Sequence, residues 1–118
     1  MDIRLKRAYD PAEEDDGQRI LVDRMWPRGI PKDKARIDWW PKDIAPSKEL
    51  RQWFNHDPDK WDKFRERYFQ ELQQHHQILE DLLKMADRTR VTLVFSSREE
   101  RTNNAAALKD YLETMSRT

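Results

Sequence analysis

A series of large side chains spaced three or four residues apart constrains the fold of this chain more than any other feature. The series is Trp61, Phe64, Tyr68, Leu72, His75, Leu79, Leu82 and Ala86. Its spacing averages close to the roughly 3.6 residues per turn of an α-helix, so it predicts one amphipathic helix of about seven turns. The apolar stripe of such a helix must be buried, so we expect it to lie across a second layer of structure.

Three shorter segments have the patterns of β-strands. Residues 3–8 alternate apolar and basic side chains, as a half-exposed edge strand does. Residues 19–23 and 91–95 contain continuous apolar or β-branched runs, which are typical of strands buried on both faces. The orientation of the first strand stays open, because the connection to the second is too short for an ordinary crossover helix.

The order of these elements favours an α/β fold. Ser47 and Asp57 are good N-caps for two helices that precede or begin the long periodic segment. A closing helix is expected to begin from Ser97, with a capping box, or from Thr102. We therefore predict one domain over residues 1–118, a small three-layer domain with a three- or four-stranded, mostly parallel sheet flanked by helices.

The composition narrows the class of protein. The 23 basic and 23 acidic side chains cancel, which removes the positive excess that nucleic-acid and anionic-membrane binders use. Without cysteine, the chain has no disulfide, thiolate nucleophile or Cys-ligated zinc. His75 and His76 are adjacent, so they cannot form the i, i+4 pair of a helical metal site, and we expect no metal.

No apolar leader precedes the first strand, and no apolar run approaches the roughly 18 residues of a membrane span. These features predict a cytoplasmic protein that does not bind membranes and does not favour nucleic acid. Neither the oligomeric state nor any cofactor can be inferred from the sequence.

The segment Asp23–Gly29 is the first candidate site. In parallel α/β sheets, ligands bind beyond the carboxyl ends of the strands, which here points to residues 23–29 and 96–104. Arg24 and Arg28 offer rigid forks of donors that suit carboxylate or phosphate, and Trp26 stands between them. Asp23 could orient an arginine or act as a base. In the structural alternative, Asp23 forms an internal ion pair with one arginine and Trp26 packs in the core.

Three residues elsewhere are further candidates. Arg51 and Asn104 could form a second side of an anion-binding site. His56 lies between two helix signals, where it could transfer protons or simply pack at a helix end. The catalytic candidates are therefore Asp23 and His56, and the ligand-binding candidates are Arg24, Trp26, Arg28, Arg51 and Asn104.

Several short motifs occur together along nearly the whole chain. They are Asp23-Arg24-Met25-Trp26-Pro27-Arg28-Gly29, Ala45-Pro46-Ser47, Trp61 with Phe64-Arg65, Tyr68 with Glu71-Leu72, and Val91-Thr92-Leu93 followed by Asn104. With these motifs the chain resembles the YeaO-like branch of the domain of unknown function 488. The resemblance implies a compact bacterial or archaeal α/β protein, and the family name states no activity. The chain departs from the family pattern in the loop after the third strand, at residues 96–102.

Two functional hypotheses follow. In the first, the chain binds, or is an enzyme acting on, a small anionic metabolite, phosphate-bearing compounds included, through the Asp23–Gly29 loop. In the second, it is a nucleic-acid or protein interaction module without catalysis that uses the basic edge Arg4, Lys6 and Arg7 and the exposed aromatic loop. The neutral net charge counts against nucleic acid but not against a protein partner.

Overall fold

The three strands form one parallel sheet in a computed structural model that describes residues 1–117. They are β1 (Ile3–Arg7), β2 (Gln18–Leu21) and β3 (Val91–Phe95), in the order β1-β3-β2. Both outer strands run parallel to β3 and begin level with Val91. The predicted α/β class and parallel sheet are confirmed, and the first strand, whose direction the sequence left open, is parallel.

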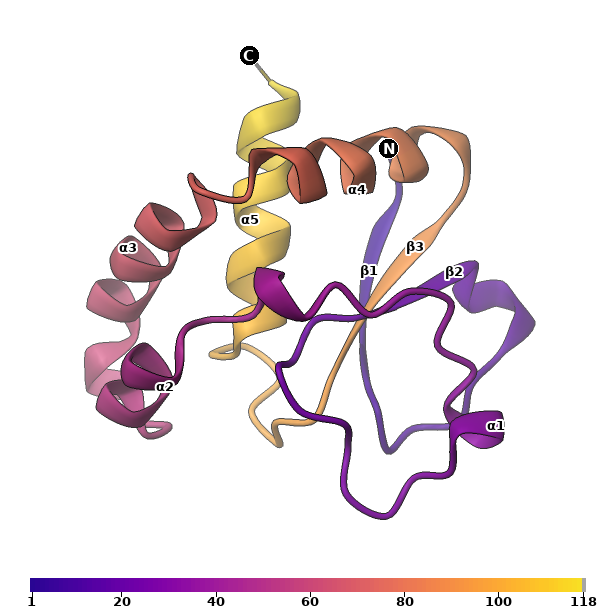
Figure 1. The fold of residues 1–118 in the computed structure, drawn as a ribbon, viewed down its shortest axis with the longest axis horizontal. Coiled ribbons are helices and arrows are strands. Elements are labelled where there is room, and N and C mark those ends of the chain that lie inside the picture. Colours follow the sequence, from indigo (N-terminus) through magenta and orange to yellow (C-terminus); the bar gives the residue numbers. More distant parts are fainter. Residues whose placement is uncertain (118) are drawn as a thin grey trace.

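Four helices form a layer on one face of the sheet (Figure 1). They are α2 (Lys48–Phe54), α3 (Trp61–Leu72), α4 (His76–Arg88) and α5 (Asn104–Ser116). The last of these, α5, contacts both β1 and β3 as well as α3 and α4, so it lies at the centre of the layer. The main core between helices and sheet contains Phe64, Tyr68, Leu72, Leu93 and Leu108, all almost fully buried.

The prediction of one helix across residues 61–86 is wrong, because α3 and α4 are separate helices. Gln74 donates to the carbonyl of Glu71 and His75 to that of Leu72, so the chain leaves α3 through tight turns before α4 begins. His75 is the most polar member of the periodic series. Buried residues continue in register on both sides of the break, and the bend lets both helices pack against α5.

The long segment between β2 and α2 covers the opposite face of the sheet. It contains only α1 (Lys32–Ala35) and the short 3₁₀ turn η2 (Lys42–Ile44). Trp26 and Trp40 meet edge to face with ring centroids 5.5 Å apart, and they pack on Ala8, Leu21 and Val94. A loop of this length is uncommon in a small domain, and here it serves as the second covering layer.

The same segment also covers the outer edge of β2. Trp39 forms a parallel bridge with Ile20, and the carbonyl of Trp39 accepts from the N–H of Leu21 at 3.0 Å. The side chain of Asp38 accepts from the N–H of Arg19 at 2.8 Å. This two-residue contact is the nearest approach to a fourth strand in residues 1–117.

Residues 8–17 return from the end of β1 to the start of β2 and carry a buried charge cluster. Asp16, in the 3₁₀ turn η1 (Glu14–Asp16), accepts from Arg19 at 2.7 Å and from Lys6 at 3.1 Å. Gly17 follows with φ of 66°, and a Cβ there would lie 2.2 Å from the carbonyl oxygen of Arg90. The crossover therefore requires glycine at this position.

Two of the predicted helix N-caps are confirmed, and the predicted start of the closing helix is wrong. Ser47 caps α2 by accepting from the N–H of Leu50, and Asp57 caps the 3₁₀ turn η3 (Pro58–Lys60), both as expected. The closing helix begins at neither predicted position, because Asn103 is its N-cap and accepts from the N–H of Ala106. Within the described chain, no helix combines the length and apolarity needed to cross a membrane.

Candidate functional site

Asp23 joins three elements at the carboxyl end of the sheet. Its Oδ2 accepts from the N–H of Ser96 at 2.9 Å, just after β3, and its Oδ1 accepts from Nδ2 of Asn104 at 3.0 Å, at the start of α5. The Asn104 amide also donates to the carbonyl of Val22 at 2.9 Å. Asp23 and Asn104 thus form a clamp between strand ends and helix. The partners of the carboxylate are amide groups, and no arginine pairs with it in residues 1–117.

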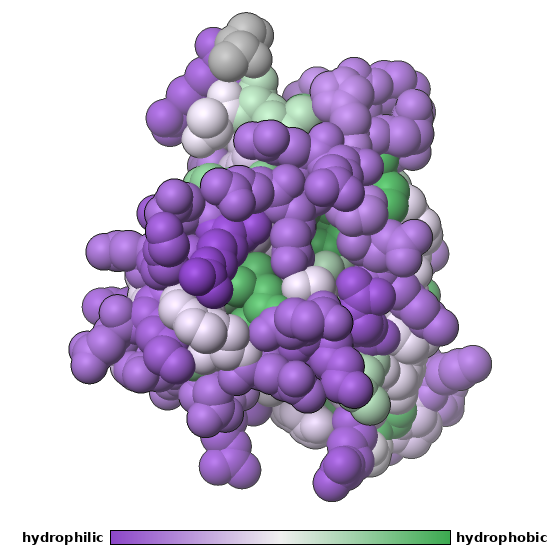
Figure 2. Space-filling model, turned by 60° about the vertical axis from the view of Figure 1, so that its left-hand side comes forward, coloured by the Kyte–Doolittle hydropathy of each residue, from purple (hydrophilic) through white to green (hydrophobic). Residues whose placement is uncertain are grey.

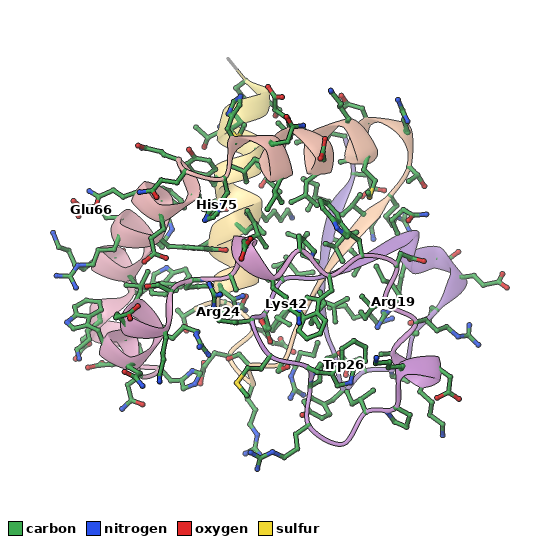
Figure 3. The ribbon with its side chains drawn as sticks, in the orientation of Figure 1. Arg19, Arg24, Trp26, Lys42, Glu66 and His75 are labelled. Carbon is green, nitrogen blue, oxygen red and sulfur yellow. The ribbon has the colours of Figure 1, made fainter. Side chains whose placement is uncertain are left out.

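Arg24 is half-buried and lacks an acidic partner. Its Nη2 donates to the carbonyl of Ala45 at 3.4 Å, and the side chain lies beside the segment that leads into α2 (Figure 3). Its Nε is buried without a hydrogen-bond partner in the described protein, where no carboxylate lies within ion-pairing distance of Arg24 either. A partly desolvated cation without a counter-charge is costly to the fold unless a ligand neutralises it.

Ser96 supplies a second polar atom next to the clamp. Its Oγ is buried and has no hydrogen-bond partner among residues 1–117, while its N–H is held by Asp23. The rule that sites form beyond the carboxyl ends of strands pointed to the segment beginning at Ser96. Nothing in the sequence distinguished its hydroxyl from that of Ser97.

Tyr68 lies beneath this cluster. Its hydroxyl is fully buried and donates to the carbonyl of Ile44 at 2.6 Å. Burial raises the pKa of Tyr68 well above its ordinary value; the nearby charges of Asp23 and Glu71 add to the shift, and Arg24 opposes it. The periodic series placed Tyr68 in the core, but its electrostatic neighbours come from distant segments that the sequence did not connect.

Glu71 fixes the other side of the cluster. Its two carboxylate oxygens accept from the N–H and the hydroxyl of Ser47 at 2.8 and 2.6 Å. Ser47 in turn caps α2, so Glu71 ties α3 to the start of α2. This carboxylate is occupied by neutral donors, as that of Asp23 is.

Trp26 and Arg28 lie apart from Arg24. The indole N–H of Trp26 donates to the carbonyl of Ile30 at 2.7 Å, and the ring belongs to the covering layer on the opposite face of the sheet (Figure 3). Arg28 is exposed, and its backbone carbonyl accepts from the hydroxyl of Tyr9 at 3.0 Å. The contacts therefore separate the two arginines that the sequence grouped into one turn.

Arg51 lies in the middle of α2, and His56 follows the C-terminal end of this helix. Arg51 is half-buried, one turn after Ser47, and its Nε is another buried nitrogen without a partner in the described chain. His56 is exposed with φ of 56°, and its ring centroid is 6.4 Å from that of Phe54. Across residues 1–117, no hydrogen bond joins either side chain to Asp23, and no group of three or more acidic, His or Cys side chains is placed to hold a metal ion.

The fold and the site together define a small parallel α/β protein with an Asp–Asn clamp and an unpaired arginine at its strand ends. Residues 2–118 match a family model described as the inactive DUF488-N3 subclade. The chain belongs to this YeaO-like DUF488 family, as the resemblance in its motifs predicted.

Relatives of known sequence support the same assignment. The chain is 45% identical to the uncharacterized protein YeaO of Escherichia coli over 115 residues, which cover 98% of this chain and 100% of the relative. It is 46% identical to uncharacterized proteins of Mycobacterium tuberculosis and Mycobacterium bovis over 110 residues, 93% of this chain and 92% of each relative. No solved structure was found to match this chain.

Proposed function

We propose that the chain binds a small anion, a phosphate or carboxylate group of a metabolite, at the carboxyl end of its sheet through Arg24. The observation that carries this proposal is the half-buried guanidinium of Arg24, whose Nε has no partner and which forms no ion pair with a carboxylate in the described residues. Arginine presents its donors in a planar fork that matches both kinds of anion.

Two neighbours support an anion beside Arg24. The hydroxyl of Ser96 can donate to an anion, and it is buried without a partner in residues 1–117. The 13-residue helix α5 begins at Asn104, next to the clamp, and its positive end favours a negative group. Arg51, whose Nε is also unpartnered, is the candidate second cation.

Binding without catalysis is the form of the hypothesis that we favour. Both carboxylate oxygens of Asp23 already accept hydrogen bonds, which leaves this residue poorly suited to act as a base. His56 is exposed at the far end of α2 and forms no hydrogen bond with another described residue. The description of the matching family as inactive agrees with assigning no catalytic residue here.

Thermal unfolding with added anions tests the proposal. The probes are inorganic phosphate, citrate and a nucleoside monophosphate, compared with sodium chloride at equal ionic strength. A ligand at ten times its Kd stabilises the native state by about 1.4 kcal/mol, and each kcal/mol raises Tm by roughly 4 °C in a domain of this size. We therefore expect at least one probe to raise Tm by roughly 5 °C.

Matched arginine variants locate the site. Arg24→Met should abolish the rise in Tm, whereas Arg28→Met, at the exposed turn, should keep it. Arg51→Met should reduce the rise if Arg51 is the second cation. The proposal fails if none of the three probes stabilises the wild type, or if Arg24→Met still responds in full.

The nucleic-acid form of the alternative loses its main support. Each cation of the basic edge is engaged within the protein, Arg4 by Asp2 and Lys6 by Glu13 and Asp16. Arg7 donates to the carbonyl of Ser97 at 3.0 Å. A gel-shift titration at low salt provides the direct check, and we expect no complex with duplex or single-stranded DNA.

A further inference from the structure

The two edges of the sheet differ in how they are covered. The outer edge of β2 is covered by Trp39, whereas the outer edge of β1 faces no strand or bridge within residues 1–117. An open edge presents backbone N–H and C=O groups that can pair with another extended chain. The edge of β1 is therefore the one place where the sheet can accept a further strand.

The register shows which backbone groups of β1 face outward. The carbonyl of Asp2 accepts from Val91 at 2.9 Å, and the N–H of Ala8 donates to Phe95 at 2.7 Å, so even-numbered residues are bonded to β3. Backbone groups point alternately to the two sides of a strand. The backbone groups of Ile3 and Leu5 and the N–H of Arg7 consequently point away from the sheet, while the carbonyl of Arg7 accepts from the N–H of Asp10 at 3.1 Å.

A hollow of about 590 Å³ follows this edge. Its lining includes Leu5 and other residues of β1, Asp10 and Asp15 from the crossover, and Glu100 from the loop after β3. The lining also includes Arg90 and Thr92 at the start of β3 and Phe95 at its end, so the hollow extends along the length of β1. An extended segment bound beside β1 could contact this lining along its length.

The side chains that line this hollow have a small net negative charge. Its lining contains five acidic and four basic side chains, and the carboxylate of Asp2 is shared between Arg4 and Arg90. Arg7 donates to a carbonyl and keeps its charge. The carboxylates of Asp10, Asp15 and Glu100 form no ion pair with any described residue. Charge complementarity therefore favours a partner segment that carries basic side chains.

We propose that the β1 edge binds an extended, basic segment of a partner protein, which adds to the sheet as a further strand. Hydrogen bonds to the outward backbone groups of Leu5 and its odd-numbered neighbours provide affinity, and the unpaired carboxylates select lysine or arginine at alternate positions. A second copy of this chain is a poorer partner, because pairing two β1 edges would place the same unpaired carboxylates of both copies close together, where they repel. This site is separate from the anion site at Arg24.

A peptide probe tests the proposal without altering the protein. The probe is a fluorescent peptide of alternating lysine and valine, compared with the same peptide carrying glutamate in place of lysine. We expect the lysine peptide to bind at least tenfold more tightly than the glutamate peptide. Two further peptides carry N-methyl groups on the odd-numbered or on the even-numbered residues. One of them should not bind and the other should keep its Kd within threefold of the unmethylated peptide, because only one set of N–H groups faces β1.

Variants of the protein locate the peptide. Leu5→Pro removes an outward N–H that β3 does not use, so the sheet should form while the peptide binds at least tenfold more weakly; Leu5→Ala, which keeps the N–H, is the matched control. If circular dichroism shows that Leu5→Pro does not fold, hydrogen exchange of the wild-type protein is measured in its place. The peptide should then slow the exchange of the Leu5 and Arg7 amides.

Other outcomes overturn the proposal. It is wrong if the two methylated peptides bind alike, if the glutamate peptide binds as well as the lysine peptide, or if a folded Leu5→Pro protein binds like the wild type. It is also wrong if analytical ultracentrifugation shows a dimer that Leu5→Pro dissociates and that excludes the peptide, because a second copy would then occupy the edge.

Discussion

Asp16 and Asp23 lie at opposite ends of β2, and the fold surrounds them with different partners. Asp16, before the strand, accepts from the cations Lys6 and Arg19. Asp23, after the strand, accepts from the neutral groups of Ser96 and Asn104. The buried carboxylate at the amino end therefore pairs with cations of the protein, whereas the cation of Arg24 at the carboxyl end forms no ion pair within the described residues. This difference is why we place a ligand at one end of the sheet and a structural role at the other.

The largest effect is expected at the amino end. Asp16→Ala leaves Arg19, whose side chain is only 3% exposed, without its carboxylate. Removing one partner of a buried ion pair costs about 3–5 kcal/mol, and we expect a loss of that size in urea unfolding. Asp15→Ala, at an exposed neighbour, is the control and should change stability by less than about 0.5 kcal/mol. An equal loss in both variants would contradict the buried pair.

The pH dependence of stability sharpens the same contrast. Burial alone would raise the pKa of Asp16, but hydrogen bonds from the backbone of Glu13 and from Lys6 and Arg19 hold it below its usual 3.8. The unfolded chain therefore takes up a proton at a higher pH than the native protein, and stability should fall as the pH drops below about 4. Asp16→Asn should flatten this decline in acid unfolding curves. An unchanged slope would mean that Asp16 is not responsible.

A smaller loss is expected at the carboxyl end. Asp23→Asn replaces one acceptor oxygen by an NH₂ group, so the donors of Ser96 and Asn104 cannot both keep their partner. Hydrogen bonds to charged groups contribute about 1.5–3 kcal/mol, and we expect a loss of about 2 kcal/mol in urea unfolding. Asn104→Ala should cost a similar amount, and the double variant little more than either alone. Additive losses would show that the two side chains act independently.

The ionisation of Tyr68 gives a second test at the carboxyl end of the sheet. Because its native pKa is raised, the unfolded chain loses its proton first, and stability should fall as the pH rises above about 10. Tyr68→Phe should remove this decline and cost about 1–2 kcal/mol at neutral pH, since the carbonyl of Ile44 loses its donor. Tyr9→Phe, at an exposed tyrosine, should leave the alkaline decline in place.

The smallest effect is expected at Arg24. Arg24→Met removes a cation that forms no ion pair in the described chain and one long hydrogen bond of 3.4 Å. We expect its free energy of unfolding to change by less than about 1 kcal/mol in either direction, in contrast to Asp16→Ala. A loss of several kcal/mol would assign Arg24 to the scaffold and remove the contrast between the two ends of the sheet.

Local sequence patterns predicted the regular parts of the fold. The strand at 91–95 and the caps at Ser47 and Asp57 matched, because each depends on residues close in sequence. The break at His75 did not, since it depends on how α3 and α4 pack against α5. The contact of Trp39 with the edge of β2 could not be predicted from local patterns either, because it joins backbone groups nearly twenty residues apart.

The sequence predicted where in the fold the candidate site lies, but not the directions in which its side chains point. The strand-end rule correctly placed Asp23 beside the segment from Ser96 to Asn104. It could not show that Arg24 and Trp26 face different layers, because side-chain direction in an irregular loop is set by distant partners such as Ala45 and Ile30. The hydroxyl of Ser96 and the position of Tyr68 beneath the clamp needed coordinates for the same reason.

The contact between Trp39 and β2 limits how molecules of this protein can associate. A sheet with two accessible sides can lengthen without end, as amyloid fibres do. Here one side is already occupied by the chain's own Trp39 segment, so two copies that paired through β1 would leave no open edge for a third. Copies of this chain that associate through the sheet therefore form pairs and not polymers, although β1 has an open edge.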